Sequence, residues 1–463
     1  MSRVRDGRRA VVIGGGIAGL SAAWSLSKAG WQVVVFEADD RWGGKITSSS
    51  FGGLTGIDAG ADAFLARVPE ARALAVELGM GDDLIAPATG AALVVRRGRL
   101  HPIPDGLVLG VPAGLGGLAR SRLISWPGKL RASADVVLPR RDHGDSLGRL
   151  ISGRFGREIA DYLVDPLVGS INAGTIDELS LEASTPQIAP IAQRSRSLLL
   201  GLRQGTKSAP GGPVFLTPHG GMASLVDRLV GALVAAGVTM HSGCPITSLR
   251  PAASDRWLVD DEMVDGVVLA TPAGPSAALI RPHASEVADQ LADIAYAGVV
   301  MVTALVPRSE LAAIGAVSGY LVPKPEQGQV TAVSFSSRKW PHWWATDHEV
   351  MRVSLGHTGN PRPMTMSDDE IRATVSREVG GHLGLQRDMK VAEFRITRWE
   401  NAFPQYRPGH PGRVLELDRQ LELTMPGIVL AGAAYRGIGI PACIRDGVRA
   451  AHLLSERAGN APE

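Results

Sequence analysis

The sequence predicts an α/β fold combined with an α+β fold: a discontinuous α/β domain, a second domain built on a mixed sheet, and a mainly helical inserted domain. Three observations lead to this prediction. The chain opens with a strand, a glycine turn, a helix and a second strand. A strand, a glycine-rich turn and a helix return near its other end. Between them, a proline-punctuated helical segment and a series of strand-like apolar runs interrupt the α/β pattern.

Composition excludes several classes of protein. The 463 residues suffice for two or three domains, at roughly one per ~150 residues. A formal net charge of +2 does not favour a nucleic-acid partner, because such proteins carry a basic excess. Cys244 and Cys443 lie far apart, which argues against a disulfide framework or a metal site and fits a reducing cytoplasm. Glycine is the outlier at 56 residues, roughly 12% of the chain against a usual ~7%.

Neither a membrane span nor a cleaved signal is expected. The apolar stretch Leu225–Val238 is interrupted by Asp227 and Arg228, and a span needs about 20 apolar residues. The basic N-terminus is followed by an apolar stretch that contains a glycine turn and continues into a second strand, so that stretch belongs to the fold. We therefore expect a cytoplasmic protein.

The N-terminal pattern is the fingerprint of a Rossmann-like dinucleotide-binding unit. A strand at residues 10–13 leads into the turn Gly14–Gly19, a helix through Ala29 and a strand at residues 33–36. In this G-x-G-x-x-G pattern the first glycine permits the tight turn, the second lets the backbone approach a pyrophosphate, and the third lets the helix pack on the strand. Glu37 follows the second strand, where a carboxylate accepts hydrogen bonds from ribose hydroxyls.

A second glycine pair bears on which dinucleotide is bound. The fingerprint alone fits NAD or FAD, but Gly43, Gly44 and Lys45 follow closely after the acid. Such a loop can fold back over the diphosphate and flavin of FAD, and a nicotinamide dehydrogenase does not need it. The positive charge of Lys45 would stabilise phosphate or flavin oxygens; the alternative is a solvated loop lysine.

The residue pattern changes in the middle of the chain. Residues 56–64 are small and glycine-rich, which predicts a turn against which a ring system can lie, and residues 69–80 have a helical pattern. Prolines punctuate the segment from about 100 to 212, and residues 146–163 have helical apolar spacing, which predicts the inserted helical domain. Three arginines on the opposite face are expected to be solvated, namely Arg149, Arg154 and Arg157.

The α/β pattern then resumes and is followed by a sheet. A helix over residues 223–236, a bent strand pair over 238–249 and a strand over 266–272 continue the first domain. Later strand-like runs, with one helix near 368–383, predict a mixed antiparallel sheet laid over the cofactor domain. These runs are Val299–Val306, Val330–Phe335, Val350–Leu355 and Val391–Arg398.

These patterns divide the chain into three domains, of which the first is assembled from separate segments. The nucleotide-binding domain comprises residues 1–68, 213–275 and 412–463. The substrate-binding domain comprises residues 69–100 and 285–411, and the helical domain residues 101–212.

The segment Pro426–Gly447 carries the most specific signal. A buried strand ends at Gly432, a glycine-rich turn follows, and the next helix can point its N-terminus at an anionic part of a flavin. With this segment the chain resembles the FAD-dependent porphyrinogen oxidases, which have a flavin amine oxidase-like architecture. The matching segments run from end to end: Gly14–Gly19, Glu37–Ala38, Gly43–Lys45, Asp58–Phe64, Asp165–Gly174, Thr217–Leu225, Arg398–Trp399, Pro404–Tyr406, Gly409–His410 and Ala431–Ile444.

The resemblance implies which residues contact FAD. Ile246 should hold the adenine through its backbone, and Trp399 should form a wall of the flavin site. The alternatives are that Ile246 is only a strand residue and Trp399 only a core residue. The full set of expected contacts is Gly14, Gly15, Gly16, Ile17, Ala18, Gly19, Glu37, Ala38, Lys45, Gly60, Ala61, Asp62, Ala63, Ile246, Trp399, Ile438, Gly439 and Ile440.

The resemblance also implies an oxidase of haem biosynthesis. Coproporphyrinogen III would be oxidised to coproporphyrin III in three two-electron steps, with hydride transfer to the flavin, oxygen as acceptor and release of hydrogen peroxide. No side chain is identified as a catalytic base, because the flavin carries the chemistry. Hand-over of the product to a ferrochelatase-type enzyme is a further expectation. The propionates need polar partners, and the candidates, each with a solvated surface position as its alternative, are Arg67, Arg338, Lys339, His342 and Tyr406.

Other functions stay open at this point. Protoporphyrinogen IX is the nearest alternative substrate, but the lack of a membrane span and the solubility of a four-propionate substrate favour coproporphyrinogen III. A flavin amine oxidase should have an aromatic cage, for which the C-terminal motif offers Tyr435 alone. A carotenoid desaturase should expose a more apolar surface. A non-catalytic lipid carrier of the same fold is disfavoured by the intact flavin motifs.

Overall fold

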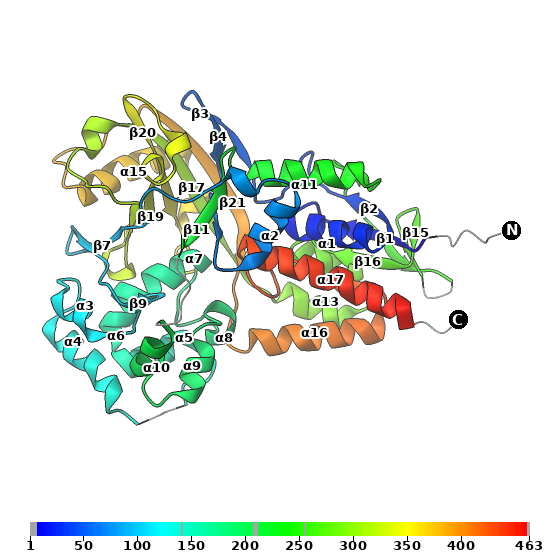
Figure 1. Ribbon diagram of the computed structural model, residues 1–463, viewed down its shortest axis with the longest axis horizontal. Coiled ribbons are helices and arrows are strands. Elements are labelled where there is room, and N and C mark those ends of the chain that lie inside the picture. Colours follow the sequence, from blue (N-terminus) through cyan, green and yellow to red (C-terminus); the bar gives the residue numbers. More distant parts are fainter. Residues whose placement is uncertain (1–6, 140–141, 207–211, 254–255, 461–463) are drawn as a thin grey trace.

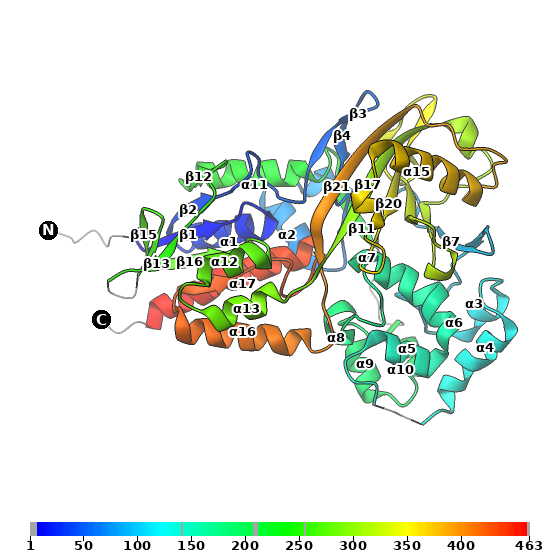
Figure 2. The ribbon, with the colours of Figure 1, turned by 180° about the vertical axis from the view of Figure 1, so that it is seen from behind.

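A parallel sheet, a larger mixed sheet and a group of helices make up the computed structural model, which describes residues 7–139, 142–206, 212–253 and 256–460. In Figure 1 the parallel sheet and its helices lie on the right, the larger sheet at the upper left and the group of helices below that sheet. Figure 2 shows two long strands, β17 (Tyr296–Pro307) and β21 (Glu393–Pro404), that reach from the larger sheet toward the parallel one.

The parallel sheet has five strands in the order β12-β2-β1-β16-β22. In its centre, β1 (Arg9–Ile13) pairs with β2 (Gln32–Phe36) on one side and β16 (Gly266–Leu269) on the other. The edge strands are β12 (Thr239–His241) and β22 (Ile428–Leu430). The central strands are apolar runs buried on both faces, as parallel strands covered by helices must be. The predicted α/β unit is confirmed.

Three long helices cover one face of this sheet. They are α1 (Ile17–Lys28), α11 (Ala223–Ala235) and α17 (Ile440–Asn460), and their buried residues share one apolar cluster with the sheet. Helices α1 and α17 approach each other closely, because a Cβ atom on Gly447 would lie 2.1 Å from the carbonyl oxygen of Ala18. Only glycine therefore fits at this contact.

The short helix α2 (Pro69–Glu77) belongs to the same apolar cluster and contacts α17. The structure therefore places α2 with the parallel sheet, whereas the sequence assigned residues 69–100 to the second domain. The remaining domain limits stay a prediction. The other face of the sheet is covered by α12 (Ala273–Ile280), α13 (Ser285–Ala292) and α16 (His410–Thr424).

The larger sheet has seven strands in the order β21-β17-β20-β19-β18-β7-β8. Its strands are antiparallel except where β18 pairs with β7 in parallel. Helix α15 (Asp368–His382) packs on it and begins with a capping box formed by Ser367 and Glu370. The predicted mixed sheet and its helix are confirmed. The remaining strands are β20 (His348–Leu355), β19 (Val330–Phe335), β18 (Gly319–Leu321), β7 (Ala92–Arg96) and β8 (Arg99–Pro102).

Helices dominate the described part of the chain between β8 and residue 215. The helix predicted over 146–163 is interrupted at Gly156, whose φ is +90°, and continues into a π-helix at Ala160–Gly169. The elements of this part are β9 (Leu107–Val108), β10 (Val111–Pro112), α3 (Leu115–Arg120), α4 (Trp126–Ser133), α5 (Leu147–Phe155), α6 (Arg157–Ile159), α7 (Ser170–Asn172), α8 (Leu181–Ser184), α9 (Ala189–Arg194) and α10 (Leu198–Thr206).

Arg154 corrects one sequence prediction in this part. It was expected on a solvated face, but the residue is 2% exposed. Its Nη1 donates to the carbonyl of Arg196 at 2.5 Å and lies 3.5 Å from Oδ1 of Asp135. Because a buried guanidinium needs partners, Arg154 ties α5 to the segment before α10.

Two short segments also differ from their predictions. The turn predicted over 56–64 is shorter, since β4 (Leu54–Asp58) pairs with β3 (Ser48–Phe51) and β5 (Phe64–Leu65) pairs with β11 (Phe215–Pro218). Only residues 59–63 form the connection. Strand β11 also pairs with β6 (Leu84–Ile85).

The strand pair predicted over 238–249 is not a pair. Strand β12 belongs to the parallel sheet, whereas β13 (Leu249–Pro251) belongs to a separate sheet with β14 (Trp257–Val259) and β15 (Glu262–Val264). Ile246 lies in the irregular segment between them, so it is not the strand residue that the sequence predicted.

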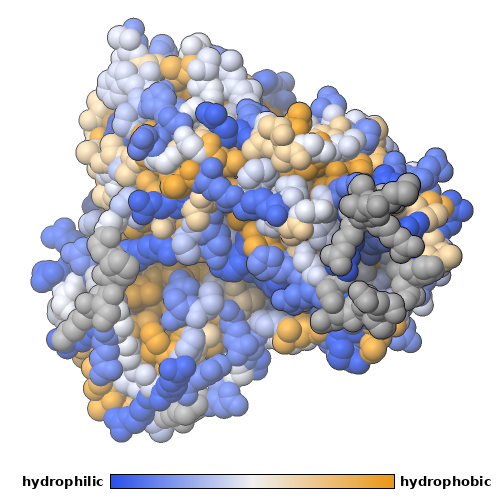
Figure 3. Space-filling model, turned by 45° about the vertical axis from the view of Figure 1, so that its right-hand side comes forward, coloured by the Kyte–Doolittle hydropathy of each residue, from blue (hydrophilic) through white to orange (hydrophobic). Residues whose placement is uncertain are grey.

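The surface carries hydrophilic residues over most of the face in Figure 3, with smaller apolar areas between them. The most exposed large apolar side chains include Val137, at 73%, and Trp126, at 71%. Single exposed apolar side chains are ordinary on proteins. Among the helices of the described residues, none combines the length and the apolar character needed to cross a bilayer.

Candidate cofactor-binding site

The first glycine turn joins β1 to α1 at the carboxyl edge of the parallel sheet. Gly14 has a φ of +113°, and a Cβ atom there would lie 2.8 Å from the backbone of Ala270. A Cβ atom on Gly19 would lie 1.9 Å from the carbonyl oxygen of Gly14. These two positions require glycine for the turn and for close packing of the helix.

Gly16 has a different environment from its neighbours. A Cβ atom there would have no heavy atom within 4 Å, so open space lies in front of this residue. Gly16 is the N-cap of α1 and provides no side-chain cap, which leaves the first amide groups of the helix available. An uncapped helix N-terminus beside open space fits the phosphates of a dinucleotide.

Glu37 holds the first turn in place. One of its carboxylate oxygens accepts from the amide of Gly15 at 2.6 Å, and the other accepts from the amide of Asp39 at 2.9 Å. A carboxylate has further lone pairs, so Glu37 can also accept from ribose hydroxyls. The neighbouring Ala38 is exposed.

The second glycine loop lies against the first. The amide of Gly43 donates to the carbonyl of Gly15 at 2.8 Å, and a Cβ atom on Gly44 would lie 3.4 Å from the Cα atom of Gly16. Lys45 follows and donates from Nζ to the carbonyl of Ala402 on β21, at 2.5 Å. Burial of the ammonium group lowers the pKa of Lys45, although the residue as a whole is exposed.

Lys45, Gly60 and Trp399 form one cluster, although they are far apart in the sequence. A Cβ atom on Gly60 would lie 2.3 Å from the carbonyl oxygen of Lys45 and 3.4 Å from the Trp399 ring. The ring nitrogen of Trp399 donates to the carbonyl of Ala59 at 3.2 Å. Trp399 is half-buried, so part of its surface stays available to a ligand. Ala61 is exposed beside this cluster.

Asp62 is held by three side chains of the larger sheet and its connections. It accepts from Nζ of Lys339 and from the ring nitrogen of Trp340, each at 3.0 Å, and lies 3.5 Å from Nη1 of Arg352. Burial alone would raise the pKa of Asp62, but the positive charges of Lys339 and Arg352 hold it well below its usual range. The side chain of Asp62 and the charge of Lys339 are therefore engaged with each other.

Arg352 is a residue of this site that the sequence reasoning missed. Its guanidinium donates to the carbonyl of Gly60 and pairs with Asp62, so it fixes the loop at residues 59–63. The residue is 6% exposed. A lone arginine within the apolar strand β20 was the signal that could have identified it, because an unpaired buried charge is unfavourable.

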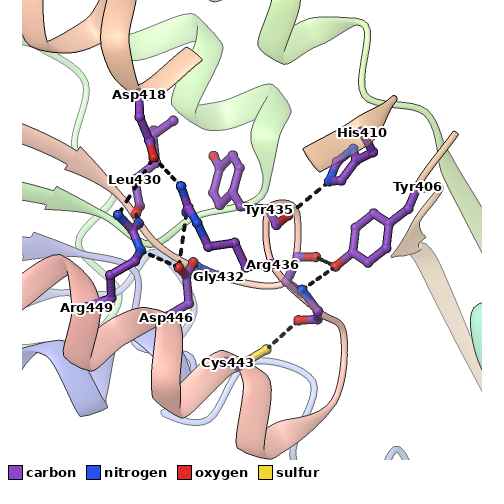
Figure 4. A network of polar contacts seen from close by, with 12 residues as sticks. Tyr406, His410, Asp418, Leu430, Gly432, Tyr435, Arg436, Cys443, Asp446 and Arg449 are labelled. Carbon is purple, nitrogen blue, oxygen red and sulfur yellow. Dashed lines mark hydrogen bonds and ion pairs between the residues drawn. The ribbon is translucent and has the colours of Figure 1, made fainter. Parts of the chain in front are cut away.

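A charge network around the buried Asp446 holds the C-terminal glycine turn (Figure 4). Asp446 accepts from the amide of Gly432 at 2.9 Å, from Arg436 at 3.1 Å and from Arg449 at 2.7 Å. Arg449 also donates to the carbonyl of Leu430 at 2.6 Å, and Arg436 contacts Asp418. The network connects the end of β22 to α17, whose first residue is Ile440.

Tyr406 supports the same turn and differs from its prediction as a substrate contact. Its hydroxyl donates to the carbonyl of Ala433 and accepts from the amide of Gly437 at 3.0 Å. Its ring stacks on His410 at 4.4 Å, and the residue is 1% exposed. Tyr406 is therefore part of the framework. Ile438 is half-buried and Gly439 exposed at the open side of the turn.

Arg338 also differs from its prediction as a substrate contact. In α14 (Ser336–Lys339) its guanidinium makes two hydrogen bonds to Glu349, at 2.7 and 3.0 Å, and three to backbone carbonyls. These bonds occupy its donors. Arg67, by contrast, is exposed, and its guanidinium has no ion-pair partner among the residues that the structure describes.

His342 lies beside aromatic rings. Its ring is 5.3 Å from that of His219 and 5.8 Å from that of Trp343, and neither ring nitrogen has a hydrogen-bond partner among the described residues. Burial, together with His219, lowers the pKa of His342 to about 4. The imidazole is therefore neutral at pH 7.

Replacing His342 by phenylalanine should make the protein less sensitive to acid. In the unfolded chain a histidine binds a proton as the pH falls through about 6.5, whereas folded His342 does so only near pH 4. Protonation of the unfolded chain therefore lowers the free energy of unfolding as the pH falls from about 6.5 to about 4. For this partly exposed group we expect the wild type to lose about 1 kcal/mol more than the variant. Urea unfolding of both proteins between pH 7 and 4.5 measures this difference. An equal dependence of the unfolding free energy on pH in wild type and variant would contradict the prediction.

Most of the predicted cofactor residues meet at one edge of the parallel sheet. The turns 14–19, 43–45 and 59–63 contact one another, and α1 and α17 begin at the same carboxyl edge, after β1 and β22. In open α/β sheets this edge is where ligands bind. Ile246 follows β12, the edge strand beyond β2.

Comparison with known proteins gives a consistent result. The model of the family described as flavin containing amine oxidoreductase matches residues 17–455. A coproporphyrinogen III oxidase of Propionibacterium freudenreichii subsp. freudenreichii is 32% identical over 97% of this chain and 91% of that protein. The coproporphyrinogen III oxidase of Bacillus subtilis (strain 168) is 30% identical over 96% and 97%. A solved structure from Exiguobacterium sp. 255-15, provisionally named a protoporphyrinogen oxidase, matches with a TM-score of 0.86 and 28% identity over 99% and 100%.

Proposed function

Because the chain belongs to the family of flavin-containing amine oxidoreductases, we propose that this FAD-dependent oxidoreductase oxidises coproporphyrinogen III to coproporphyrin III. The observation that supports this substrate is the match to coproporphyrinogen III oxidases over nearly the whole of both chains. Oxidation in three two-electron steps, with oxygen as acceptor and hydrogen peroxide as product, belongs to the same proposal. So does the hand-over of product to a ferrochelatase-type enzyme.

Residues at the carboxyl edge of the parallel sheet would hold the adenosine and diphosphate parts of FAD. The amide groups at the start of α1, in front of Gly16, would bind the diphosphate, and Glu37 and Ala38 would contact the ribose. Ile246 would contact the adenine from its irregular segment. The open space at Gly16 and the uncapped N-terminus of α1 support the role in binding the diphosphate.

The residues near β21 would hold the flavin end. When bound, FAD supplies the acceptor for the hydrogen removed from the substrate. Trp399 and the turn 59–63 would form one wall, Ile438, Gly439 and Ile440 another, and Lys45 would hold the second loop against the carbonyl of Ala402. Arg352 would act as a positioning residue, because it fixes Gly60 and Asp62. No side chain is assigned as a base.

The assay that tests this function uses the purified FAD-loaded protein with two substrates. With coproporphyrinogen III under air we expect porphyrin fluorescence and hydrogen peroxide; without oxygen we expect loss of the flavin absorbance. Protoporphyrinogen IX should react more slowly. Faster oxidation of protoporphyrinogen IX would contradict the substrate assignment. If neither substrate lowers the flavin absorbance without oxygen, the proposed function is contradicted.

Arg67 remains the proposed contact to a propionate group, because its guanidinium is exposed and has no ion-pair partner in the described part of the chain. Replacing Arg67 by alanine should raise KM for coproporphyrinogen III about tenfold, the loss expected for one charged contact, with kcat changed less than twofold. Steady-state kinetics measure both constants. The control is Arg72→Ala on α2, an exposed arginine nearby; equal effects of the two changes would contradict the role of Arg67.

Tyr435 bears on the alternative of an amine oxidase. The sequence offered it as the one aromatic residue of the C-terminal motif, but the structure buries it to 2% within the apolar cluster under the sheet. Its carbonyl accepts from His410 at 3.0 Å when that nitrogen carries the proton. Tyr435 therefore belongs to the core and not to an open cage, which favours the porphyrinogen substrate.

A further inference from the structure

A basic hollow of about 380 Å³ lies outside the cofactor site, between the β7–β8 hairpin and the segment that joins α3 to α4. None of the residues predicted to contact FAD or substrate lines it. A concave surface lined by charges of one sign attracts ligands of the opposite sign. The lining residues are Arg96, Arg97, Arg99, His101, Arg122 and Ser125.

The hairpin places three of these side chains on one face. Arg96 on β7 pairs directly with Arg99 on β8, and like charges opposite each other destabilise a strand pair. His101 follows Arg99 by two residues on the same strand, so both lie on the same face. The hairpin therefore brings basic groups together at some loss of stability.

A half-buried carboxylate, that of Glu158, holds the two walls of the hollow together. Oε1 of Glu158 accepts from Nη2 of Arg96 at 2.5 Å and from the amide of Ser125 at 2.9 Å, and its Oε2 accepts from the hydroxyl of Ser125 at 2.6 Å. Ser125 also caps the N-terminus of α4. Glu158 thus balances the charge of Arg96 and fixes the hairpin against the start of α4.

A second carboxylate fixes the turn of the hairpin through backbone amides, without an ion pair to the guanidinium of Arg97 in the described part of the chain. Glu326 accepts from the amides of Arg97 and Gly98, at 2.9 and 3.4 Å. Both residues are in the left-handed region, with φ of +51° and +67°, as a tight hairpin turn requires. Glu326 therefore orders the backbone that carries the arginines.

Three guanidinium groups of the hollow have no carboxylate partner among the described residues: those of Arg97, Arg99 and Arg122. All three residues are exposed and come from two different parts of the chain. The framework around them is ordered by Glu158 and Glu326, yet their charges are not balanced. This combination is that of a formed site for an anion.

We propose that this hollow binds a small anion that carries two or more phosphate or carboxylate groups. A guanidinium group forms paired hydrogen bonds to a phosphate or a carboxylate group. Arginines on both walls of the hollow can therefore bind more than one anionic group of the same ligand. The volume lies within the range of small-ligand sites. The proposal does not depend on the substrate of the flavin reaction, since the hollow shares no residue with that site.

Calorimetric titration of the FAD-loaded protein at low salt tests the proposal with two probes, inorganic pyrophosphate and citrate. We expect one of them to bind with a stoichiometry of one, and the double variant Arg99→Gln with Arg122→Gln to weaken that binding at least tenfold. Stronger binding of pyrophosphate would identify a phosphate ligand, and stronger binding of citrate a polycarboxylate. Higher salt should weaken binding, because exposed charges are screened.

Two further variants separate a specific site from general charge. Arg194→Gln with Arg250→Gln removes the same charge from two exposed positions elsewhere and should leave binding unchanged. The double variant Arg99→Lys with Arg122→Lys keeps the charge but loses the paired hydrogen bonds. Its affinity should therefore fall less than that of the double glutamine variant at the same positions. No binding of either probe, equal weakening by the two glutamine pairs, or binding only to vesicles of anionic lipid would overturn the proposal.

Discussion

Replacing Gly16 by valine should weaken FAD binding about 100-fold, the loss of one or two hydrogen bonds to a charged phosphate, while the protein without FAD folds normally. The added side chain would enter the open space in front of α1, where no protein atom lies within 4 Å of the Cβ position. The backbone of Gly16, with φ of −71° and ψ of 170°, accepts a branched residue. Fluorescence titration of the apoprotein with FAD measures the affinity, and circular dichroism measures the fold.

The matched control for this change is Gly412→Val. A Cβ atom on Gly412 would likewise have nothing within 4 Å, but this residue lies on α16, at an exposed position. We expect its FAD affinity to equal that of the wild type. Unchanged affinity in the Gly16 variant would mean that the diphosphate lies elsewhere.

Replacing Asp446 by asparagine should lower the free energy of unfolding by about 3 kcal/mol, because it leaves a charged network without its buried acceptor. The side chain of Asp446 is 1% exposed, and its two arginine partners keep only about a quarter of their surface. Asparagine preserves the shape and can still accept from the amide of Gly432. Urea unfolding of the apoprotein measures the loss.

Asp418→Asn is the control for the network. Asp418 contacts the same two arginines, Arg436 and Arg449, but its side chain is 28% exposed. Water can replace it, so the expected loss is below about 1 kcal/mol. A larger loss for Asp418 than for Asp446 would contradict the view that the buried carboxylate holds the C-terminal turn.

Local patterns predicted the parallel sheet well. The conformations of the glycine turn at 14–19 and of the apolar strands around it are determined by residues close together in the sequence. Gly14 adopts a positive φ, and Gly19 makes a close packing contact. Four of the seven strands of the larger sheet, β17, β19, β20 and β21, were likewise visible as apolar runs, whereas β18, β7 and β8 were not predicted. The π-helix at Ala160–Gly169 carried no such signal, because its apolar spacing resembles that of an ordinary helix.

The partners of polar side chains could not be predicted in the same way. Arg338 and Tyr406 have the chemistry of substrate contacts, but tertiary packing places Glu349 and the carbonyl of Ala433 against them. Asp446 and Arg436 stood within the C-terminal motif, and only the fold shows that they pair. Arg352 was detectable as the one charged residue of the apolar run Val350–Leu355, although its contact with Gly60 depends on a residue 292 positions away.

The close contact between Gly447 and Ala18 packs α1 directly against α17. The spacing of their two N-termini therefore depends on a position that lies within the helix pair. If FAD bridges the two N-termini, it would meet a surface set by this packing, and little conformational entropy would be lost on binding. A larger residue at position 447 would change that spacing from the far side of the contact, without touching the cofactor.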